Sequence, residues 1–161
     1  MPRTKWFNAH HAPIGAFATF TLGSPGATGG LGLELGKPAD ENIYIGLETQ
    51  EPNTFEAFPF YQAALDESAR YSMEHATTLA AECPAQVRPF AEDSIDRRFA
   101  LATDCWSAGD LSVTIYSPVH SIPDPDTADA EEVKAVVLPA VCVEMTVDNS
   151  QGTTPRRAFL G

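Results

Sequence analysis

The stretch of sequence that decides the fold is residues 139–147, which read Pro139-Ala140-Val141-Cys142-Val143-Glu144-Met145-Thr146-Val147. From position 141 onward, every second residue is valine or methionine, and the residues between them are smaller or polar. Successive side chains of a strand point to opposite faces, so this period of two predicts a β-strand with one apolar face and one polar face. Such a strand belongs to an antiparallel sheet that is exposed to water on one side.

Other segments repeat this alternation, and they lie on both sides of the first along the chain. They predict strands over residues 14–22, 42–48, 94–103 and 111–117, and the beginning of another over 156–160. Several short strands separated by turn residues are typical of a sandwich. The sequence therefore predicts an all-β protein, an antiparallel β-sandwich that occupies residues 1–161 as a single domain or most of one.

Turn and helix signals lie between these strands. Residues 107–110, which include Gly109, predict a hairpin loop. Asp129, followed three residues later by Glu132, predicts a helix of about two turns before Pro139. Residues 117–126 contain three prolines and predict an extended surface connection. Residues 65–81 predict an irregular segment with one or two helical turns.

The glycine-rich segment 23–36 does not have the spacing of a nucleotide-binding loop. A phosphate-binding loop ends in Gly-Lys-Ser/Thr, whereas Lys37 is followed by Pro38. We interpret this segment as a hairpin or long loop in which the glycines adopt positive φ angles.

Composition excludes several classes of partner. The 161 residues contain 10 Lys and Arg and 22 Asp and Glu, which gives a formal charge of −12. Such a surface repels nucleic acid and anionic lipid. No apolar run approaches the roughly 20 residues that a membrane span needs, and residues 1–8 do not resemble a signal peptide. We expect a cytoplasmic protein that binds neither nucleic acid nor membrane, with its three cysteines reduced and buried.

Few residues suggest chemistry. His10 and His11 are adjacent, so on a strand they point to opposite faces and cannot easily bind one metal ion. With Asn8 and Trp6 nearby they are candidates to bind the hydroxyl groups of a ligand, and the alternative is a structural role at the start of a strand. Asp104 and Glu144 are candidates for partly buried carboxyl groups with raised pKa values, and the alternative is a solvated face. We find no catalytic constellation, and we predict no metal and no cofactor.

Several long segments resemble the amino-terminal region of glycoside hydrolase family 52, the β-xylosidases. The resemblance runs in order along most of the chain and is weakest at 72–89. The matching segments are residues 7–23, 29–35, 43–48, 66–71, 102–118 and 138–149.

The resemblance implies a two-domain enzyme, in which an amino-terminal β-sandwich precedes a larger (α/α)6 barrel. It implies that the enzyme releases xylose from xylooligosaccharides with retention of configuration, through two carboxyl groups. Both lie in the barrel, so no catalytic residue is assigned to this chain. It also implies a homodimer. Asn8, His10 and His11 are the residues that we expect to reach the substrate.

The carboxyl end of the chain favours the same interpretation. Residues 158–161 lie in a predicted strand with no polar tail after it, so we expect a front portion of a longer polypeptide. The alternative is a stand-alone carbohydrate-binding or interaction module, in which Trp6, Trp106 or Tyr116 stacks on a sugar ring. Aromatic residues at alternating strand positions are more often part of a core, which counts against this alternative.

Overall fold

A computed structural model describes residues 9–11, 18–23, 29–33, 41–51, 54–61, 86–117, 121–138 and 140–161. These residues form eleven strands, one α-helix and one 3₁₀ turn. The elements are β1 (Ala9–His11), β2 (Ala18–Leu22), β3 (Gly30–Leu33), β4 (Ile45–Glu48), β5 (Thr54–Ala57), β6 (Gln86–Pro89), the 3₁₀ turn Glu92–Ser94, β7 (Ile95–Phe99), β8 (Thr103–Ala108), β9 (Leu111–Tyr116), α1 (Ala130–Val136), β10 (Cys142–Val147) and β11 (Ala158–Leu160).

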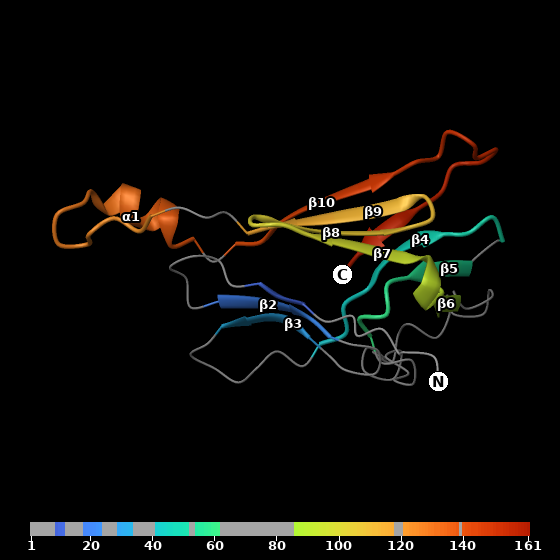
Figure 1. Cartoon of the computed structure of the whole chain (residues 1–161), viewed down its shortest axis with the longest axis horizontal. Helices are drawn as coiled ribbons and strands as arrows, with labels where there is room; N and C mark the ends of the chain where they lie inside the picture. Colours follow the sequence, from blue (N-terminus) through green and yellow to red (C-terminus); the bar gives the residue numbers. More distant parts are fainter. Residues whose placement is uncertain are drawn as a thin grey trace, which may run out of the picture.

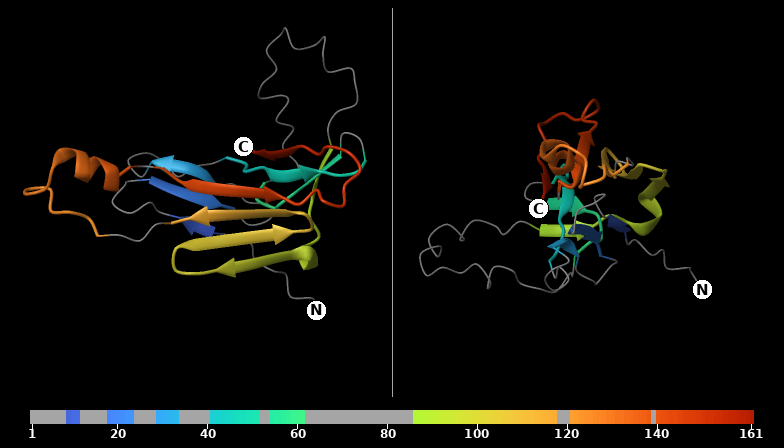
Figure 2. Two further views of the ribbon diagram at one scale, coloured as in Figure 1. Left: turned by 90° about the horizontal axis from the view of Figure 1, so that it is seen from above. Right: turned by 90° about the vertical axis from the view of Figure 1, so that its left-hand side faces the viewer.

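The strands form three sheets. Sheet I has the order β1-β2-β3, sheet II has the order β10-β9-β8-β7, and sheet III has the order β11-β4-β5-β6. Figure 1 shows sheet II above sheet I, with sheet III at the opposite end of the molecule from α1. The four strands of sheet II lie side by side in the left-hand view of Figure 2. The predicted all-β, sandwich-like fold is therefore confirmed.

A single hydrophobic core joins the three sheets. Its centre is aromatic: the ring of Trp106 on β8 lies 5.1 Å from that of Phe60 and 6.3 Å from that of Phe58, measured between centroids. Edge-to-face contacts of this kind add to the stabilisation from burial alone. Members from all three sheets surround these rings: Phe20 and Leu22 from sheet I, Ile45 and Leu47 from sheet III, and Ile95, Leu111, Val113 and Ile115 from sheet II.

The period of two located the strands of sheet II well. The segment predicted over 139–147 forms β10, and the segment predicted over 111–117 forms β9. The hairpin between β8 and β9 is confirmed, and Gly109 at its tip has a φ of 54°, which glycine adopts without strain. The helix α1 is confirmed too, and the Asp129 side chain accepts a hydrogen bond from the amide of Glu131 at its start.

One predicted strand is in fact two. Residues 94–103 were expected to form a single strand, but β7 ends at Phe99 and β8 begins at Thr103. A tight turn joins them, in which the amide of Ala100 donates to the carbonyl of Thr103. The alternation of side chains continues through the turn, which is why sequence periodicity alone did not reveal it.

Sheets I and III contain strands that the sequence did not predict. Strands β1, β3, β5 and β6 have three or four residues each, too few for a clear alternation. Strand β3 lies inside the glycine-rich segment 23–36, which was expected to be a hairpin or a long loop, and it pairs antiparallel with β2. Strand β6 pairs with β5 in parallel, so the sandwich is not wholly antiparallel.

Several expectations fall on residues outside the described ranges, namely the irregular segment 65–81, Trp6 and Cys83. The expectation of buried cysteines is wrong for Cys142, which is exposed, and Cys105 is half-buried. Both lie on the outer face of sheet II, where the alternation places them. Among the described residues, no helix is long and apolar enough to cross a membrane.

Candidate functional site

The described residues contain one buried cluster of charged groups, and it is centred on Asp104. The side chain of Asp104 on β8 is 0% exposed. Arg97 on β7 donates two hydrogen bonds to it, from Nε to Oδ1 at 2.7 Å and from Nη2 to Oδ2 at 2.6 Å. This two-point geometry is the strongest that an arginine and a carboxylate can form.

The register of sheet II explains how these residues meet. Phe99 lies directly opposite Asp104, and Arg97 lies directly opposite Trp106, so all four side chains share the inner face. The guanidinium carbon of Arg97 lies 4.5 Å from the centroid of Trp106 and 5.4 Å from that of Phe99. Two aromatic rings and a carboxylate therefore hold the Arg97 guanidinium in place.

His11 joins this cluster from sheet I. Its ring is 6% exposed, with Nε2 at 3.3 Å from Oδ2 of Asp104 and Nδ1 at 3.1 Å from Oγ of Ser117. Nδ1 can accept a hydrogen bond from the serine hydroxyl when Nε2 carries the ring proton, whereas Nε2 lies near the carboxylate without the geometry of a hydrogen bond. His11 thus connects β1 to Asp104 on β8 and to Ser117, the residue that follows β9.

The surroundings of Asp104 decide its ionisation. Burial raises the pKa of this carboxyl, but the nearby ring N–H groups of His11 and Trp106, together with the two hydrogen bonds and the positive charge of Arg97, lower it below its usual range. The expectation of a raised pKa is therefore wrong for Asp104. A carboxyl group that stays ionised cannot donate a proton as a general acid, so the geometry suits an anchor that holds β1 against sheet II.

Comparison with known proteins decides the family. Residues 20–161 match the sequence profile described as glycosyl hydrolase family 52. The chain belongs to glycosyl hydrolase family 52. Two curated relatives from Geobacillus stearothermophilus are each named β-xylosidase. One is 52% identical over 163 residues, which cover 100% of this chain and 23% of the relative. The other is 44% identical over 163 residues, which cover 97% of this chain and 26% of the relative.

The chain therefore spans about a quarter of the length of the family members that it matches. The predicted resemblance to family 52 is confirmed.

The three residues predicted to bind substrate do not all lie within the described structure. Asn8 lies outside the described residues. His10 is on β1, where its backbone pairs with Thr21. His11 is the one that joins the Asp104 cluster, and both of its ring nitrogens already face protein groups. Substrate binding by Asn8, His10 and His11 stays a prediction.

Two other candidates, Glu144 and Tyr116, lie on the outer face of sheet II. Glu144 is exposed and accepts a hydrogen bond of 2.6 Å from the hydroxyl of Tyr116. This bond, together with desolvation and the negative charge of Glu144, raises the pKa of Tyr116.

Trp106 was a candidate for stacking on a sugar ring, but it is 1% exposed and belongs to the core. Among the described residues, no group of three or more His, Cys, Asp or Glu side chains could hold a metal ion.

Sequence reasoning missed Arg97 as a member of the site. The sequence carries no local signal for this role, because the register that brings Arg97 to Asp104 depends on the turn after Phe99, which periodicity did not show.

Proposed function

We propose that this chain is the amino-terminal portion of a retaining β-xylosidase that releases xylose from xylooligosaccharides. The observation that carries the proposal is the 52% identity to a protein named β-xylosidase along the whole length of the chain. The β-rich, sandwich-like fold is consistent with the non-catalytic part of such an enzyme.

In this proposal the chain is a scaffold and one wall of the substrate pocket. A retaining glycosidase needs two carboxyl groups about 5 Å apart on either side of the bond that it cleaves. Asp104 is enclosed by Arg97 and His11, so it does not fit this requirement. As the resemblance to family 52 implies, we assign both catalytic carboxyl groups to the remainder of the enzyme, an (α/α)6 barrel.

The same proposal includes a homodimer in the cytoplasm. Light scattering of the complete enzyme gives its oligomeric state, and cell fractionation gives its location.

A chimeric enzyme tests the proposed function. In it, this chain replaces the matching segment of the 52% identical β-xylosidase, and the rest of that enzyme is unchanged. We expect the chimera to hydrolyse an aryl β-xyloside and xylobiose, and the isolated 161-residue chain to hydrolyse neither. Hydrolysis by rigorously purified isolated chain, lost on changing Asp104 or Glu144, contradicts the proposal. Saturable binding of xylooligosaccharides by the isolated chain favours the binding-module alternative instead.

A further inference from the structure

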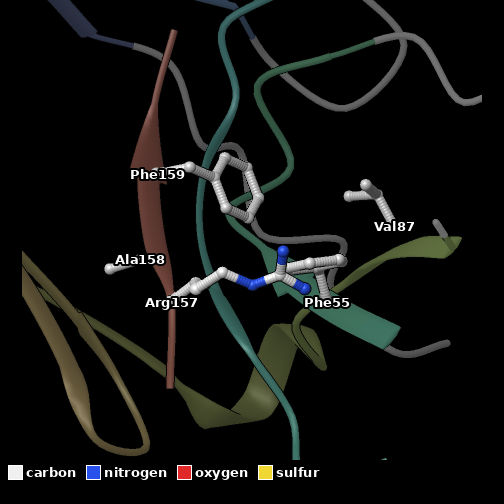
Figure 3. A pocket seen from close by; sticks show the side chains of 5 residues that line it. All are labelled: Phe55, Val87, Arg157, Ala158 and Phe159. Carbon is white, nitrogen blue, oxygen red and sulfur yellow. The ribbon is translucent and has the colours of Figure 1, made fainter. Parts of the chain in front are cut away.

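A cavity of about 440 Å³ lies against sheet III, away from the Asp104 cluster. Phe55, Val87, Arg157, Ala158 and Phe159 line it. Figure 3 shows the side chain of Phe159 reaching from β11 across β4, and the side chain of Arg157 lying beside Phe55. The two phenyl rings meet edge to face, with centroids 5.6 Å apart. We refer to Phe55, Val87, Arg157 and Phe159 as the outer slot.

The outer slot lies on the face of sheet III that points away from the core. Ile45, Leu47 and Ala158 pack into the core from the other face. Phe159 lies directly opposite Gly46 and Val87 lies opposite Phe55, so these residues alternate with the core positions. Apolar side chains therefore lie on both faces of sheet III.

Sheet II provides a contrast within the same chain. The outer face of β9 and of the edge strand β10 carries Ser112, Thr114 and Glu144, which are polar, as expected for a face exposed to water. On the outer face of sheet III, by contrast, Val87 is 38% exposed, beside the half-buried Phe159 and Phe55, which is 9% exposed. An apolar pocket that opens at a surface is a candidate interaction site.

The floor of the outer slot is shaped for close packing. A Cβ atom on Gly46 would lie 2.4 Å from the carbonyl oxygen of Glu56 and 2.5 Å from Cζ of Phe159. Only glycine at this position lets the Phe159 ring lie across β4. The ring is thus held in a defined place before anything binds.

The charge of Arg157 is already neutralised within the chain. Its guanidinium donates to both carboxylate oxygens of Glu48, at 2.8 and 3.1 Å, and lies 5.3 Å from the centroid of Phe55. Hydrogen bonds from Arg157 also lower the pKa of Glu48. An anionic ligand would have to compete with Glu48, whereas an apolar group meets two rings and Val87. The chemistry of the outer slot therefore favours apolar side chains of a protein segment over a small anion.

We propose that the outer slot is the surface on which the remainder of a family 52 enzyme packs, through an aliphatic or aromatic side chain inserted between Val87 and Phe159. The relatives supply such an occupant, because about three quarters of their length lies outside the region that matches this chain. This inference rests on the proposed function and identifies the surface by which the scaffold meets the rest of the enzyme.

Two matched variants test the inference. Val87→Asp places a carboxylate in the outer slot, and Thr146→Asp places one on the exposed outer face of sheet II, at a position of similar size and the same β-branched shape. Each variant is made in the isolated chain and in the active chimera. The readouts are the unfolding temperature of the isolated chain and the half-life of xylosidase activity at elevated temperature.

We expect both variants to unfold at similar temperatures in the isolated chain. In the chimera we expect Val87→Asp to shorten the half-life at least about tenfold more than Thr146→Asp, because a carboxylate buried without a partner is strongly unfavourable. Peptide-resolved hydrogen exchange on the unsubstituted proteins is a second measurement, and we expect residues 157–160 to exchange more slowly in the chimera than in the isolated chain.

Equal half-lives for the two variants, with equal exchange of residues 157–160 in both proteins, overturn the inference while leaving an active chimera and the proposed function intact. A large loss of stability in the isolated Val87→Asp chain also overturns it, since the face is then covered by the chain itself. A dimer of the isolated chain that Val87→Asp disperses, with no effect in the chimera, assigns the surface to a second copy. If Val87→Asp yields no soluble chimera, the exchange measurement decides. If the chimera without substitutions is inactive, the proposed function, on which this inference rests, is contradicted.

Discussion

Replacing Asp104 with asparagine tests the role assigned to the buried cluster. The substitution keeps the shape of the side chain but removes its charge and turns one acceptor oxygen into a donor. That donor faces Arg97 Nε at the Oδ1 position, or Arg97 Nη2 together with His11 Nε2 at the Oδ2 position. The cluster loses its single negative charge, and at least one Arg97 donor loses its acceptor.

The structure sets the size of the effect. Removing one partner of a buried ion pair costs roughly 3–5 kcal/mol. The side chain of Arg97 is 30% exposed, so water can solvate part of the charge that is left behind. We therefore expect a loss near the lower end, about 3 kcal/mol of unfolding free energy. For a chain of this size the loss corresponds to roughly 6–12 °C in the unfolding temperature.

Urea unfolding at pH 7, followed by tryptophan fluorescence, measures the loss directly, since Trp106 reports from the core. The matched control is Asp96→Asn, an exposed carboxylate on β7, with an expected change of less than about 0.5 kcal/mol. If Asp104→Asn unfolds within this same margin of the unsubstituted protein, the cluster does not stabilise the fold and the reasoning is refuted.

The pH dependence gives a second check with a definite sign. The pKa of Asp104 is lower in the folded chain than in the unfolded chain, where it is about 3.9. As the pH falls, the unfolded chain takes up the proton first. The stabilisation by Asp104 is therefore complete above roughly pH 5 and is lost as the pH falls through 4 toward the folded pKa. The difference between the two proteins should shrink over that range, and a gap that widens instead contradicts the assignment.

Three further predictions concern single contacts. Gly46→Ala should lower the unfolding temperature by several degrees and displace the Phe159 ring, because the new methyl group meets the Glu56 carbonyl; thermal unfolding followed by circular dichroism measures this. Arg156→Gln should cost about 2 kcal/mol, chiefly through the bond of 2.7 Å that its Nε donates to the carbonyl of Glu48, and urea unfolding measures the loss. Asp129→Ala should unfold helix α1 locally at a cost of about 1 kcal/mol, seen as faster amide exchange in residues 130–136 with no change elsewhere.

The strands of sheet II were predictable because their signal is local. Each of β9 and β10 has six residues, enough for a period of two to stand out, and the turn at Gly109 has its own sequence signature. Helix α1 was predictable for the same reason, since its cap lies at its own first turn. Strands β5 and β6 were missed, because short strands are specified by their pairing partners more than by their own residues.

The candidate site could likewise be predicted only in part from the sequence. The sequence pointed to His11 and to Asp104 separately, but it misjudged the ionisation of the carboxyl group. Burial alone raises such a pKa, and the two partners that reverse the effect come from different places. Arg97 reaches Asp104 through the β7–β8 register, and His11 reaches it from another sheet. No local sequence pattern indicates that Arg97 or His11 contacts Asp104.

By itself, the sequence determined the all-β class, the strands of sheet II and membership of family 52, because these depend on residue order along one segment. The tertiary structure alone decided that Arg97, His11 and Asp104 form one cluster and that sheet III carries apolar side chains on both faces. These are properties of strands brought together from distant parts of the chain, and the free energy of such contacts depends on separations in space.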